Sequence, residues 1–419
     1  MVPEKKIITC GCRFNRHESA EMLERLGETG EDMVVVNTCA VTKKSEAKSR
    51  HAVRRAVEEN PGALIVAAGC LAELSPDSLR GIKGVGLVLG NEEKFDIRRP
   101  VQEPASRTGG VRRAEKFLEL TAGRLENRSA AYLKLQNGCD ETCSFCVVRV
   151  VRGRSRSARP EFVVKRAGEL IRDGTREIVL TGINLGRYGL DLPDKTDLAS
   201  LIGLLTLTGG ARFRLSSVNP TDVTDDLINL MARTPSVCRH LHVPMQSGSD
   251  RILNLMERPH SSAQYSEAVE KAARAMPGLA IGCDVMAGFP GETEEDFEQT
   301  MRLLDALPLS YAQVFQYSPR PQTKAGAMTD SVPSSVKKER TNALKEVAAR
   351  KNLAFRRSLV GKKVEILVEA DGPRGLGRGK SDTFVEVEFH GDRPPRGALA
   401  SVVVERTTDS GVVGTAARA

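Results

Sequence analysis

The sequence predicts an α/β protein in three parts: an N-terminal doubly wound parallel sheet, a central partial β/α barrel and a small C-terminal all-β barrel. In the first two parts, short β-branched runs alternate with helical stretches, which is typical of parallel sheets. After about residue 358 the helical period disappears. Short β-branched runs then follow one another between Gly- and Pro-rich turns, which favours a small barrel.

The N-terminal part spans residues 1–95. Four strands are expected in it, at Lys5–Thr9, Met33–Val36, Leu64–Ala67 and Val85–Leu89. The stretches between the first three carry helical periodicity, at His17–Leu26 and Lys44–Glu59. Residues 96–129, which include Arg98–Pro104, contain Pro, Gly and Arg without a clear period. They are predicted to form a connector, with a strand at Phe117–Leu120.

The central part spans residues 130–357 and repeats the strand–helix alternation on a larger scale. Its expected strands are Tyr132–Gln136, Glu177–Leu180, Arg212–Ser216, His240–Val243, Ala280–Val285 and Ala312–Gln316. Its expected helices are Pro160–Arg172, Thr221–Met231, Ala263–Ala275, Thr293–Leu307 and Ser335–Arg357. Six repeats of this kind indicate a full or partial β/α barrel.

The C-terminal part spans residues 358–419. Strands are expected at Lys363–Val368, Phe384–Phe389 and Ala400–Val404. The turns between them are rich in Gly and Pro, so this part is predicted to be all-β.

Composition limits the classes of function. Lys and Arg number 62 and Asp and Glu 54, and the net charge of +8 favours a nucleic-acid partner, although many basic proteins bind none. Aromatic residues make up only 4% of the chain, so no broad base-stacking surface is indicated. Neither a leader-like start nor a run of ~18 apolar residues is seen. We therefore expect a cytoplasmic protein without a membrane partner, in which the nine cysteines stay reduced.

Three cysteines, Cys139, Cys143 and Cys146, follow the first strand of the central part. Three thiolates can hold three irons of a [4Fe-4S] cluster and leave the fourth iron open. S-adenosylmethionine can chelate that iron, and an electron from the cluster then yields a 5′-deoxyadenosyl radical. The alternative is structural zinc, but zinc normally takes four ligands and no fourth lies nearby in the sequence. The triplet predicts a radical S-adenosylmethionine enzyme.

Three further cysteines, Cys12, Cys39 and Cys70, each lie just beyond the carboxyl end of a predicted strand. In doubly wound sheets, ligands bind outside these strand ends, so the three thiols are expected to meet and hold a second cluster. The alternative is ordinary burial, since Cys is among the most buried residue types. The remaining cysteines stand in or beside apolar stretches and are assigned to packing: Cys10, Cys238 and Cys283.

Motifs around both cysteine sets resemble those of the radical methylthiotransferases. They are Gly11–Asn15, Asn37–Thr42, Gly69–Cys70, Leu180–Gly186, Pro244–Ser249 and Gly288–Glu292. The resemblance covers nearly the whole chain, and its tail is similar to the RNA-binding barrel called TRAM. It implies two [4Fe-4S] clusters and S-adenosylmethionine, used both as methyl donor and as radical source. It also implies insertion of sulfur and a methyl group into an unactivated C–H bond.

The resemblance extends to the substrate. Three subtypes act on isopentenyladenosine in tRNA, on threonylcarbamoyladenosine in tRNA, or on an aspartate of a ribosomal protein. The runs Asn37–Thr42, Leu180–Asn184 and Arg152–Ser157 look most like the threonylcarbamoyladenosine type. Two positions depart from the pattern: Arg149 replaces the usual Pro, and Asn219 replaces the usual acidic residue.

Other candidate site residues fall at strand ends or beside the first cysteine triplet. Resemblance points to S-adenosylmethionine contacts for Gly182, Ser217 and Gln246, with turn formation as the alternative for the Gly and Ser. Arg152, Arg154 and Arg156 alternate with small residues and are predicted to bind RNA phosphates, with a solvated charge run as the alternative. His240 and His242 share one side of a strand, where packing is favoured over metal binding.

The resemblance therefore implies a tRNA methylthiotransferase that modifies C2 of N6-threonylcarbamoyladenosine in the anticodon stem-loop. Such an enzyme needs a sulfur donor and an electron donor, whose identities are unknown. The first rival hypothesis is the same chemistry on isopentenyladenosine or on a ribosomal protein. A rival from another class is a non-catalytic RNA-binding iron–sulfur protein. An open iron argues against that rival, because a purely structural cluster needs no vacant position.

Overall fold

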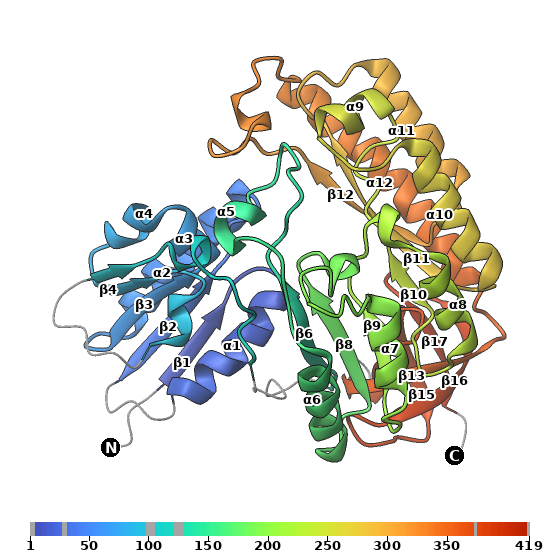
Figure 1. The fold of residues 1–419 in the computed structure, drawn as a ribbon. Helices are drawn as coiled ribbons and strands as arrows, with labels where there is room; N and C mark the ends of the chain where they lie inside the picture. The colour runs from blue at the N-terminus through green and yellow to red at the C-terminus, as the bar shows by residue number, and fades with distance from the viewer. Residues whose placement is uncertain (1–4, 27–31, 98–104, 121–128, 373–374, 417–419) are drawn as a thin grey trace.

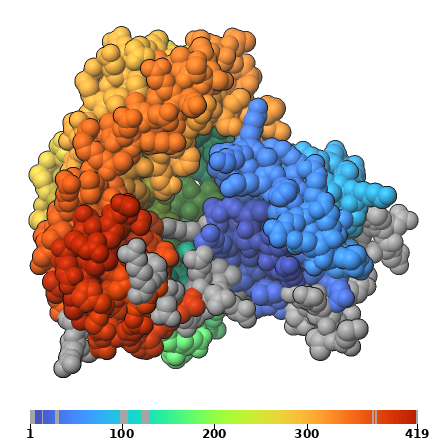
Figure 2. All heavy atoms as spheres, turned by 180° about the vertical axis from the view of Figure 1, so that it is seen from behind, coloured from blue at the N-terminus to red at the C-terminus, as the bar shows by residue number. Residues whose placement is uncertain are grey.

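The computed structural model describes residues 5–26, 32–97, 105–120, 129–372 and 375–416, arranged as an N-terminal sheet, a central arc of strands and helices, and a C-terminal barrel (Figure 1). Viewed from behind, the barrel lies at the lower left and the N-terminal part at the right, with the later segments of the central part above the barrel (Figure 2). Within the described residues, no helix combines the length and the apolar character needed to cross a membrane.

The N-terminal sheet has five parallel strands in chain order. They are β1 (Lys5–Thr9), β2 (Met33–Thr38), β3 (Leu64–Gly69), β4 (Val85–Leu89) and β5 (Ala105–Arg107). Helices cover both faces, with α1 (Arg13–Leu26) on one and α2 (Lys43–Glu59), α3 (Cys70–Leu74) and α4 (Pro76–Arg80) on the other. Alternate residues of β2 are buried in two different cores, one on each face of the sheet, as expected for a sheet covered by helices on both faces.

The central part contains six parallel strands in chain order. They are β6 (Ala131–Asn137), β8 (Glu177–Gly182), β9 (Arg212–Leu215), β10 (His240–His242), β11 (Ala280–Ala287) and β12 (Tyr311–Gln316). Isolated bridges join β9 to β10, and the short antiparallel strand β7 (Arg156–Ser157) borders β6. The result is a curved, open sheet, which confirms the partial barrel.

Helices pack on the outside of this sheet. They are α6 (Pro160–Arg172), α7 (Leu198–Thr206), α8 (Asp225–Arg233), α10 (Ser262–Ala275), α11 (Glu294–Ala306) and α12 (Ser334–Arg357). Local sequence explains where they start: α6 has Pro160 at its first turn, and α11 begins with a capping box between Thr293 and Asp296. On α6, Val163, Ala167 and Leu170 recur on one face and are buried in the core.

The tail forms a closed barrel, consistent with a TRAM-like domain. Its strand order is β13 (Lys363–Asp371), β14 (Gly377–Ser381), β15 (Glu386–Gly391), β17 (Val412–Ala416) and β16 (Leu399–Thr407). The sequence predicts β13, β15 and β16 but not β14 or β17. These two strands carry glycines where strands approach closely: a Cβ at Gly414 would lie 2.1 Å from the Val403 carbonyl oxygen.

The predicted strand at Phe117–Leu120 is wrong. This segment has no regular structure, and the extra strand is β5 instead. The apolar side chains serve packing: Leu120 is buried under the N-terminal sheet, and Phe117 packs against the central core. Of the predicted connector, residues 96–129, the stretches 98–104 and 121–128 lie outside the described residues.

A buried charge cluster fixes the tail against the central part. Glu177 on β8 accepts hydrogen bonds from Arg212 and Arg214 on β9, at 2.8 Å each. Both guanidinium groups also donate to backbone carbonyls of the tail, such as those of Lys380 and Ser381. Burial alone would raise the pKa of Glu177, but the charges of Arg214 and Arg212 lower it. The carboxylate therefore stays ionised and holds the two arginines toward the barrel.

We expect Glu177→Gln to lower the free energy of unfolding by about 3–5 kcal/mol, because it leaves two buried arginines without a carboxylate. Denaturant titration followed by circular dichroism measures this change. Glu169→Gln is the control, since Glu169 pairs with Arg166 near the surface and its loss should cost at most ~1 kcal/mol. Equal effects of the two changes would contradict the role of Glu177.

Candidate functional site

The first cysteine triplet lies in a loop at the carboxyl end of β6. The loop leads into α5 (Val148–Arg152) and folds back on itself, because the Cys139 N–H donates to the Gly153 carbonyl at 3.1 Å and the Cys146 N–H to the Cys143 carbonyl at 3.0 Å. Gly138 has a φ of +73°, and a Cβ there would lie 1.8 Å from the Arg154 carbonyl oxygen. Only glycine fits at this crossing, which holds the cysteine loop over the end of the barrel.

Each of the three thiols has an N–H donor near its sulfur. Asn184 Nδ2 lies 3.6 Å from Cys139 Sγ, and Arg258 Nη1 lies 3.3 Å from Cys143 Sγ. The backbone N–H of Val148 lies 3.4 Å from Cys146 Sγ. Hydrogen bonds to sulfur are one of the ways in which proteins stabilise iron–sulfur clusters and set their potentials. The donor set fits a cluster bound through three thiolates.

Asn219 joins two of these donors. Its Nδ2 donates to Asn184 Oδ1 at 2.9 Å, and its Oδ1 accepts from Arg258 Nη2 at 2.8 Å. A carboxylate at 219 could accept from Arg258 but could not donate to Asn184. The departure at this position is therefore accommodated by an amide that uses both its groups. Neither Asn184 nor Arg258 was predicted as a site residue.

At two cysteines of this triplet, Cys139 and Cys146, burial disfavours the thiolate. Burial raises the pKa of Cys139, and it raises the pKa of Cys146 to about 12. Metal binding must therefore displace the thiol protons. Across the part of the chain that the structure describes, no three His, Cys, Asp or Glu side chains converge tightly enough to hold a single ion.

The residues predicted to contact S-adenosylmethionine all lie at the carboxyl ends of strands. Gly182 ends β8, Ser217 follows β9 and bridges to His242, and Gln246 follows β10. Gln246 has a φ of +65°, and its backbone N–H and carbonyl both pair with β11. Of the three predicted residues, only Gln246 is among the lining residues of a cavity of about 210 Å³ beside the cysteine loop.

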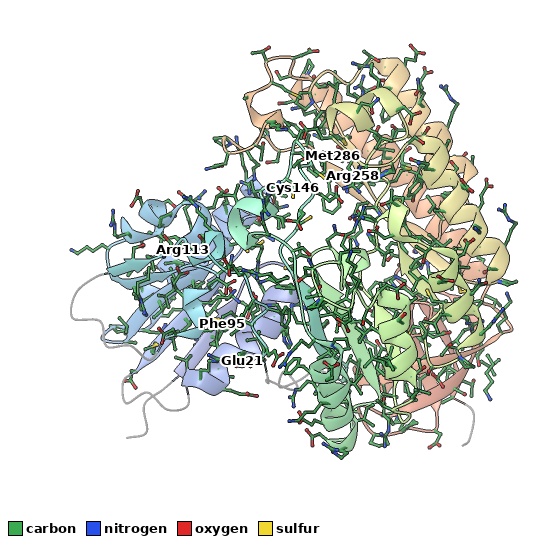
Figure 3. The ribbon with its side chains drawn as sticks, in the orientation of Figure 1. Glu21, Phe95, Arg113, Cys146, Arg258 and Met286 are labelled. Atoms are coloured by element: carbon green, nitrogen blue, oxygen red, sulfur yellow. The ribbon has the colours of Figure 1, made fainter. Side chains whose placement is uncertain are left out.

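This cavity lies between the N-terminal sheet and the central part. Cys146, Met286 and Tyr317 line it from the central part, while Val41 and Thr42 line it from the segment after β2. Figure 3 shows Cys146, Arg258 and Met286 close together where the two parts face each other. A ligand in the cavity would contact the cysteine loop and the residues just after Cys39 at the same time.

The second cysteine set gathers at the carboxyl edge of the N-terminal sheet. Cys12 follows β1 and is exposed, whereas Cys39 after β2 and Cys70 at the start of α3 are buried. Desolvation around the thiol raises the pKa of Cys12, Arg152 lowers it, and Cys70 raises it further. Burial and the charges of Cys70 and Cys12 also raise the pKa of Cys39. The structure thus brings these three thiols within electrostatic range of one another.

Neighbouring residues shape this second set. Asn91 Nδ2 lies 3.5 Å from Cys70 Sγ, and a Cβ at Gly11 would lie 2.5 Å from Cys39 Sγ. Three strands deliver the thiols to one edge, with a glycine leaving room for one sulfur and an amide donor facing another. These features fit a second iron–sulfur cluster. Asn91 was not predicted, and no motif in the sequence marks it.

The predicted RNA contacts need correction at two of three positions. Arg152 and Arg156 are each 2% exposed, whereas Arg154 is exposed. Arg152 donates to Glu18 at 2.6 Å and to Asn15 at 2.7 Å. Arg156 donates to Glu92 at 2.9 Å and to backbone carbonyls. Both guanidinium groups are engaged inside the protein, so we withdraw the RNA-binding prediction for Arg152 and Arg156.

Two further motifs, the His240–His242 pair and the Gly288–Glu292 run, make hydrogen bonds within the protein. His240 and His242 lie 2.8 and 3.0 Å from the hydroxyl of Tyr311, which agrees with packing rather than metal binding. Glu292 accepts from the Gly288 N–H at 2.9 Å and from Arg340 at 2.7 Å. The Gly288–Glu292 run therefore forms a fixed turn before α11.

Gly138→Ala should destabilise the protein by at least ~2 kcal/mol and lower its iron content, because a methyl group there displaces the segment that holds Cys139. Denaturation and iron analysis measure both effects. Gly168→Ala on α6 is the matched control: a Cβ there meets nothing within 4 Å, so we expect ~0.5–1 kcal/mol of stabilisation. Normal iron binding by Gly138→Ala would contradict the role of the crossing.

Comparison with known proteins agrees with this geometry. The family model of the radical SAM superfamily matches residues 133–304, and that of uncharacterized protein family UPF0004 matches residues 5–90. In solved structures, the radical S-adenosylmethionine methyltransferase TsrM from Kitasatospora setae superposes with a TM-score of 0.55 at 13% identity, covering 78% of this chain and 74% of that one. At this identity the likeness concerns the fold alone.

Similarity to whole sequences is more specific. Over 97% of this chain and 96% of the relative, identity is 36% to the threonylcarbamoyladenosine tRNA methylthiotransferase MtaB of Thermotoga maritima. It is 34% to the tRNA-2-methylthio-N(6)-dimethylallyladenosine synthase of Moorella thermoacetica, over 96% of this chain and 95% of the relative. The chain therefore belongs to the methylthiotransferase family of radical S-adenosylmethionine enzymes.

Proposed function

We propose that the chain adds a methylthio group to C2 of N6-threonylcarbamoyladenosine next to the anticodon of tRNA. Two cysteine sets lie on either side of one interface, and this placement supports the transfer of a methylthio group. Cys146 lines the cavity from the central part, and Val41 and Thr42, just after Cys39, line it from the N-terminal part. One site then supplies the radical while the other presents sulfur.

Radical S-adenosylmethionine enzymes use a [4Fe-4S] cluster and S-adenosylmethionine. Cys139, Cys143 and Cys146 would hold this cluster, and it would supply the electron for cleavage of the sulfonium C–S bond. Asn184 and Arg258 orient two of these thiolates through their N–H groups. The cavity at Gln246 is the proposed place for S-adenosylmethionine.

Several apolar side chains line the cavity. Phe145, Met286, Phe315 and Tyr317 line it with apolar surface, which limits the access of water to a reactive radical. At the other set, Cys12, Cys39 and Cys70 would hold the second cluster, which would present the sulfur for methylation and transfer.

The substrate side lies at an open pocket of about 530 Å³ beside the cysteine loop. Cys143 and Cys146 line it together with Arg112, Arg149 and Lys324. Arg112 and Arg149 are exposed, as is Arg154 nearby in the chain. Guanidinium groups suit bidentate contact with phosphate, so this rim is the proposed place for the anticodon stem-loop. The RNA role predicted for the arginine run thus moves to Arg154 and its exposed neighbours.

The substrate subtype rests on motifs rather than on overall identity. MtaB of Bacillus subtilis is 33% identical to the chain, and the dimethylallyladenosine synthase of Moorella thermoacetica is 34% identical. The runs Asn37–Thr42 and Leu180–Asn184 favour the threonylcarbamoyladenosine type. Dimethylallyladenosine, the nucleoside called isopentenyladenosine above, remains the second candidate substrate, because the Moorella thermoacetica synthase is similar over 96% of this chain.

Two cysteine variants separate the two proposed sites. Cys143→Ala should abolish 5′-deoxyadenosine formation, because the radical-generating cluster loses a ligand. Cys12→Ala should keep that activity, lose methylthio transfer, and lower the iron content of the reconstituted chain by about half. Liquid chromatography and iron analysis measure these quantities. Cys10→Ala is the matched control two residues away and should lose neither cluster. Unchanged iron in Cys12→Ala would contradict the second site.

The substrate is tested with tRNA of defined modification. Anaerobic reaction with tRNA that carries threonylcarbamoyladenosine should yield the 2-methylthio nucleoside, as measured by mass spectrometry of digested tRNA. Matched tRNA that carries dimethylallyladenosine should remain unmodified. If only the tRNA with dimethylallyladenosine is methylthiolated, dimethylallyladenosine is the substrate and the proposed substrate is wrong. If neither tRNA is modified, both candidate substrates are wrong.

A further inference from the structure

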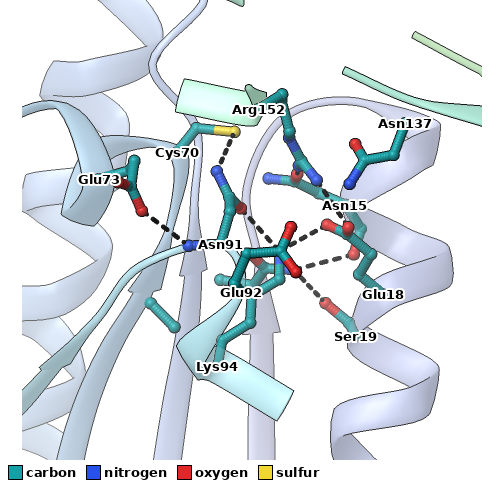
Figure 4. Close-up of polar contacts among 12 residues, drawn as sticks. Asn15, Glu18, Ser19, Cys70, Glu73, Asn91, Glu92, Lys94, Asn137 and Arg152 are labelled. Atoms are coloured by element: carbon teal, nitrogen blue, oxygen red, sulfur yellow. Dashed lines mark hydrogen bonds and ion pairs between the residues drawn. The ribbon is translucent and has the colours of Figure 1, made fainter. Parts of the chain in front are cut away.

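Four charged side chains meet inside the protein where the N-terminal sheet joins the central part. Figure 4 labels three of them, Glu18, Lys94 and Arg152. Glu18 on α1 accepts from Lys94 Nζ at 2.5 Å, from Arg152 Nη1 at 2.6 Å and from Lys134 Nζ at 3.2 Å. All four side chains are at most 2% exposed. We call these residues, Glu18, Lys94, Lys134 and Arg152, the Glu18 cluster.

The Glu18 cluster holds three cations and one carboxylate. Among the described residues, neither His17 nor Glu92 offsets this positive charge. Burial lowers the pKa of His17 to about 4, so this side chain is neutral, and Glu92 is engaged by Arg156. Burial lowers the pKa of Lys134 to about 8, which leaves it mostly protonated at neutral pH. Excess charge in a low-dielectric interior is costly, so this arrangement calls for a nearby anion.

Aromatic rings compensate part of this charge. Lys134 Nζ lies 4.8 Å from the centre of the Phe14 ring, the Arg152 guanidinium lies 4.6 Å from the same centre, and Lys94 Nζ lies 5.3 Å from that of Phe95. Each such contact contributes about 0.5–2 kcal/mol. A ring face carries no net charge, however, so the excess of positive charge remains.

The excess positive charge acts on the second cysteine set. Asn91 accepts from Lys94 Nζ at 2.9 Å and donates to Cys70 Sγ at 3.5 Å, so it connects the two directly. Negative charge on Cys70 and Cys12 would interact favourably with Arg152, and Cys70 likewise with Lys94. The Glu18 cluster therefore lies within electrostatic reach of the N-terminal thiols.

Arg152 reaches this place from the other cysteine site. It ends α5, the helix that begins two residues after Cys146. In the same helix, the Val151 carbonyl accepts from Asn91 Nδ2 at 2.7 Å. One short helix thus follows the radical-site loop and at the same time supplies a cation to the N-terminal site.

We propose that Arg152 and Lys94 are positioning residues that supply the countercharge for an anionic sulfur ligand, of the hydrosulfide class, at the cluster held by Cys12, Cys39 and Cys70. This inference rests on the proposed function. Because Arg152 belongs to the central part, the N-terminal site has this countercharge only when the two parts are in contact. Because the cations favour added negative charge, they also favour the reduced form of that cluster.

The test uses the full chain carrying both clusters, reconstituted without oxygen. We expect Arg152→Met to shift the reduction equilibrium of the N-terminal cluster about tenfold toward the oxidised form, which is ~59 mV for a one-electron couple. Hydrosulfide, added as sodium sulfide, should bind about tenfold more weakly. Titrations with a reductant and with hydrosulfide, followed by electron paramagnetic resonance, measure the reduction potential and the hydrosulfide affinity. The signal of the N-terminal cluster is identified as the one that persists in Cys143→Ala.

The control is Arg156→Met, an equally buried arginine of the same loop whose charge is paired with Glu92 and which reaches Arg152 through the backbone carbonyl of that residue. It should leave both quantities unchanged. Arg152→Lys keeps the charge and should restore most of the wild-type potential. Lys94→Met should shift the potential in the same direction as Arg152→Met, and it provides the test if the latter does not fold.

The outcomes separate this inference from the proposed function. A wild-type chain that takes up only one cluster refutes the proposed function and with it this inference. A wild-type chain with two clusters, whose N-terminal potential and hydrosulfide affinity are unchanged by Arg152→Met or Lys94→Met, refutes the inference alone. An equal shift in Arg156→Met also overturns it, because the effect would then not depend on the Glu18 cluster.

Discussion

The buried ion pairs around Glu18 determine how the two cysteine sites face each other. Glu18 comes from α1, Lys94 from the short turn η1 (Glu93–Phe95), Lys134 from β6 and Arg152 from α5, so one carboxylate joins the N-terminal sheet to the central part. Arg320 adds a second connection through Glu46 and the Ala40 carbonyl. Breaking a buried charge network is costly, and the cavity between the sites is therefore a fixed feature of the fold.

This arrangement suits a reaction that needs two separated activities close together. The cavity receives residues from both sides, with Cys146 on one and Thr42 on the other. Side-chain donors of Asn184 and Arg258 contact two thiols of the first triplet, whereas Asn91 links one thiol of the second set to Lys94 in the buried Glu18 cluster. The two sites thus differ in electrostatic surroundings although each has three cysteines.

Much of this site could be predicted because its signals are local. The Cys139–Cys146 spacing indicates three ligands of one cluster, and three strands that end in cysteine indicate a shared sheet edge. Other features depend on packing between distant segments. Arg152 and Arg156 alternate with small residues like a solvated run, and only tertiary contacts with Glu18 and Glu92 bury them.

The missed elements have similar physical causes. Strand β14 carries Gly377 and Gly379 because neighbouring strands approach too closely for side chains, and glycine in a sequence indicates a turn. The apolar run Phe117–Leu120 packs against cores without forming a strand. Arg258 lies 115 residues from the cysteine whose sulfur it contacts, so no local pattern marks it.

Anomalous diffraction at the iron edge, from crystals of the anaerobically reconstituted chain, would locate any iron at the two cysteine sets. If two iron–sulfur sites face one interface, two iron peaks are expected, one within the loop of Cys139, Cys143 and Cys146 and one among Cys12, Cys39 and Cys70 beside Arg152. A single peak at the first loop, with no iron at the N-terminal cysteines of a fully loaded protein, would contradict this arrangement.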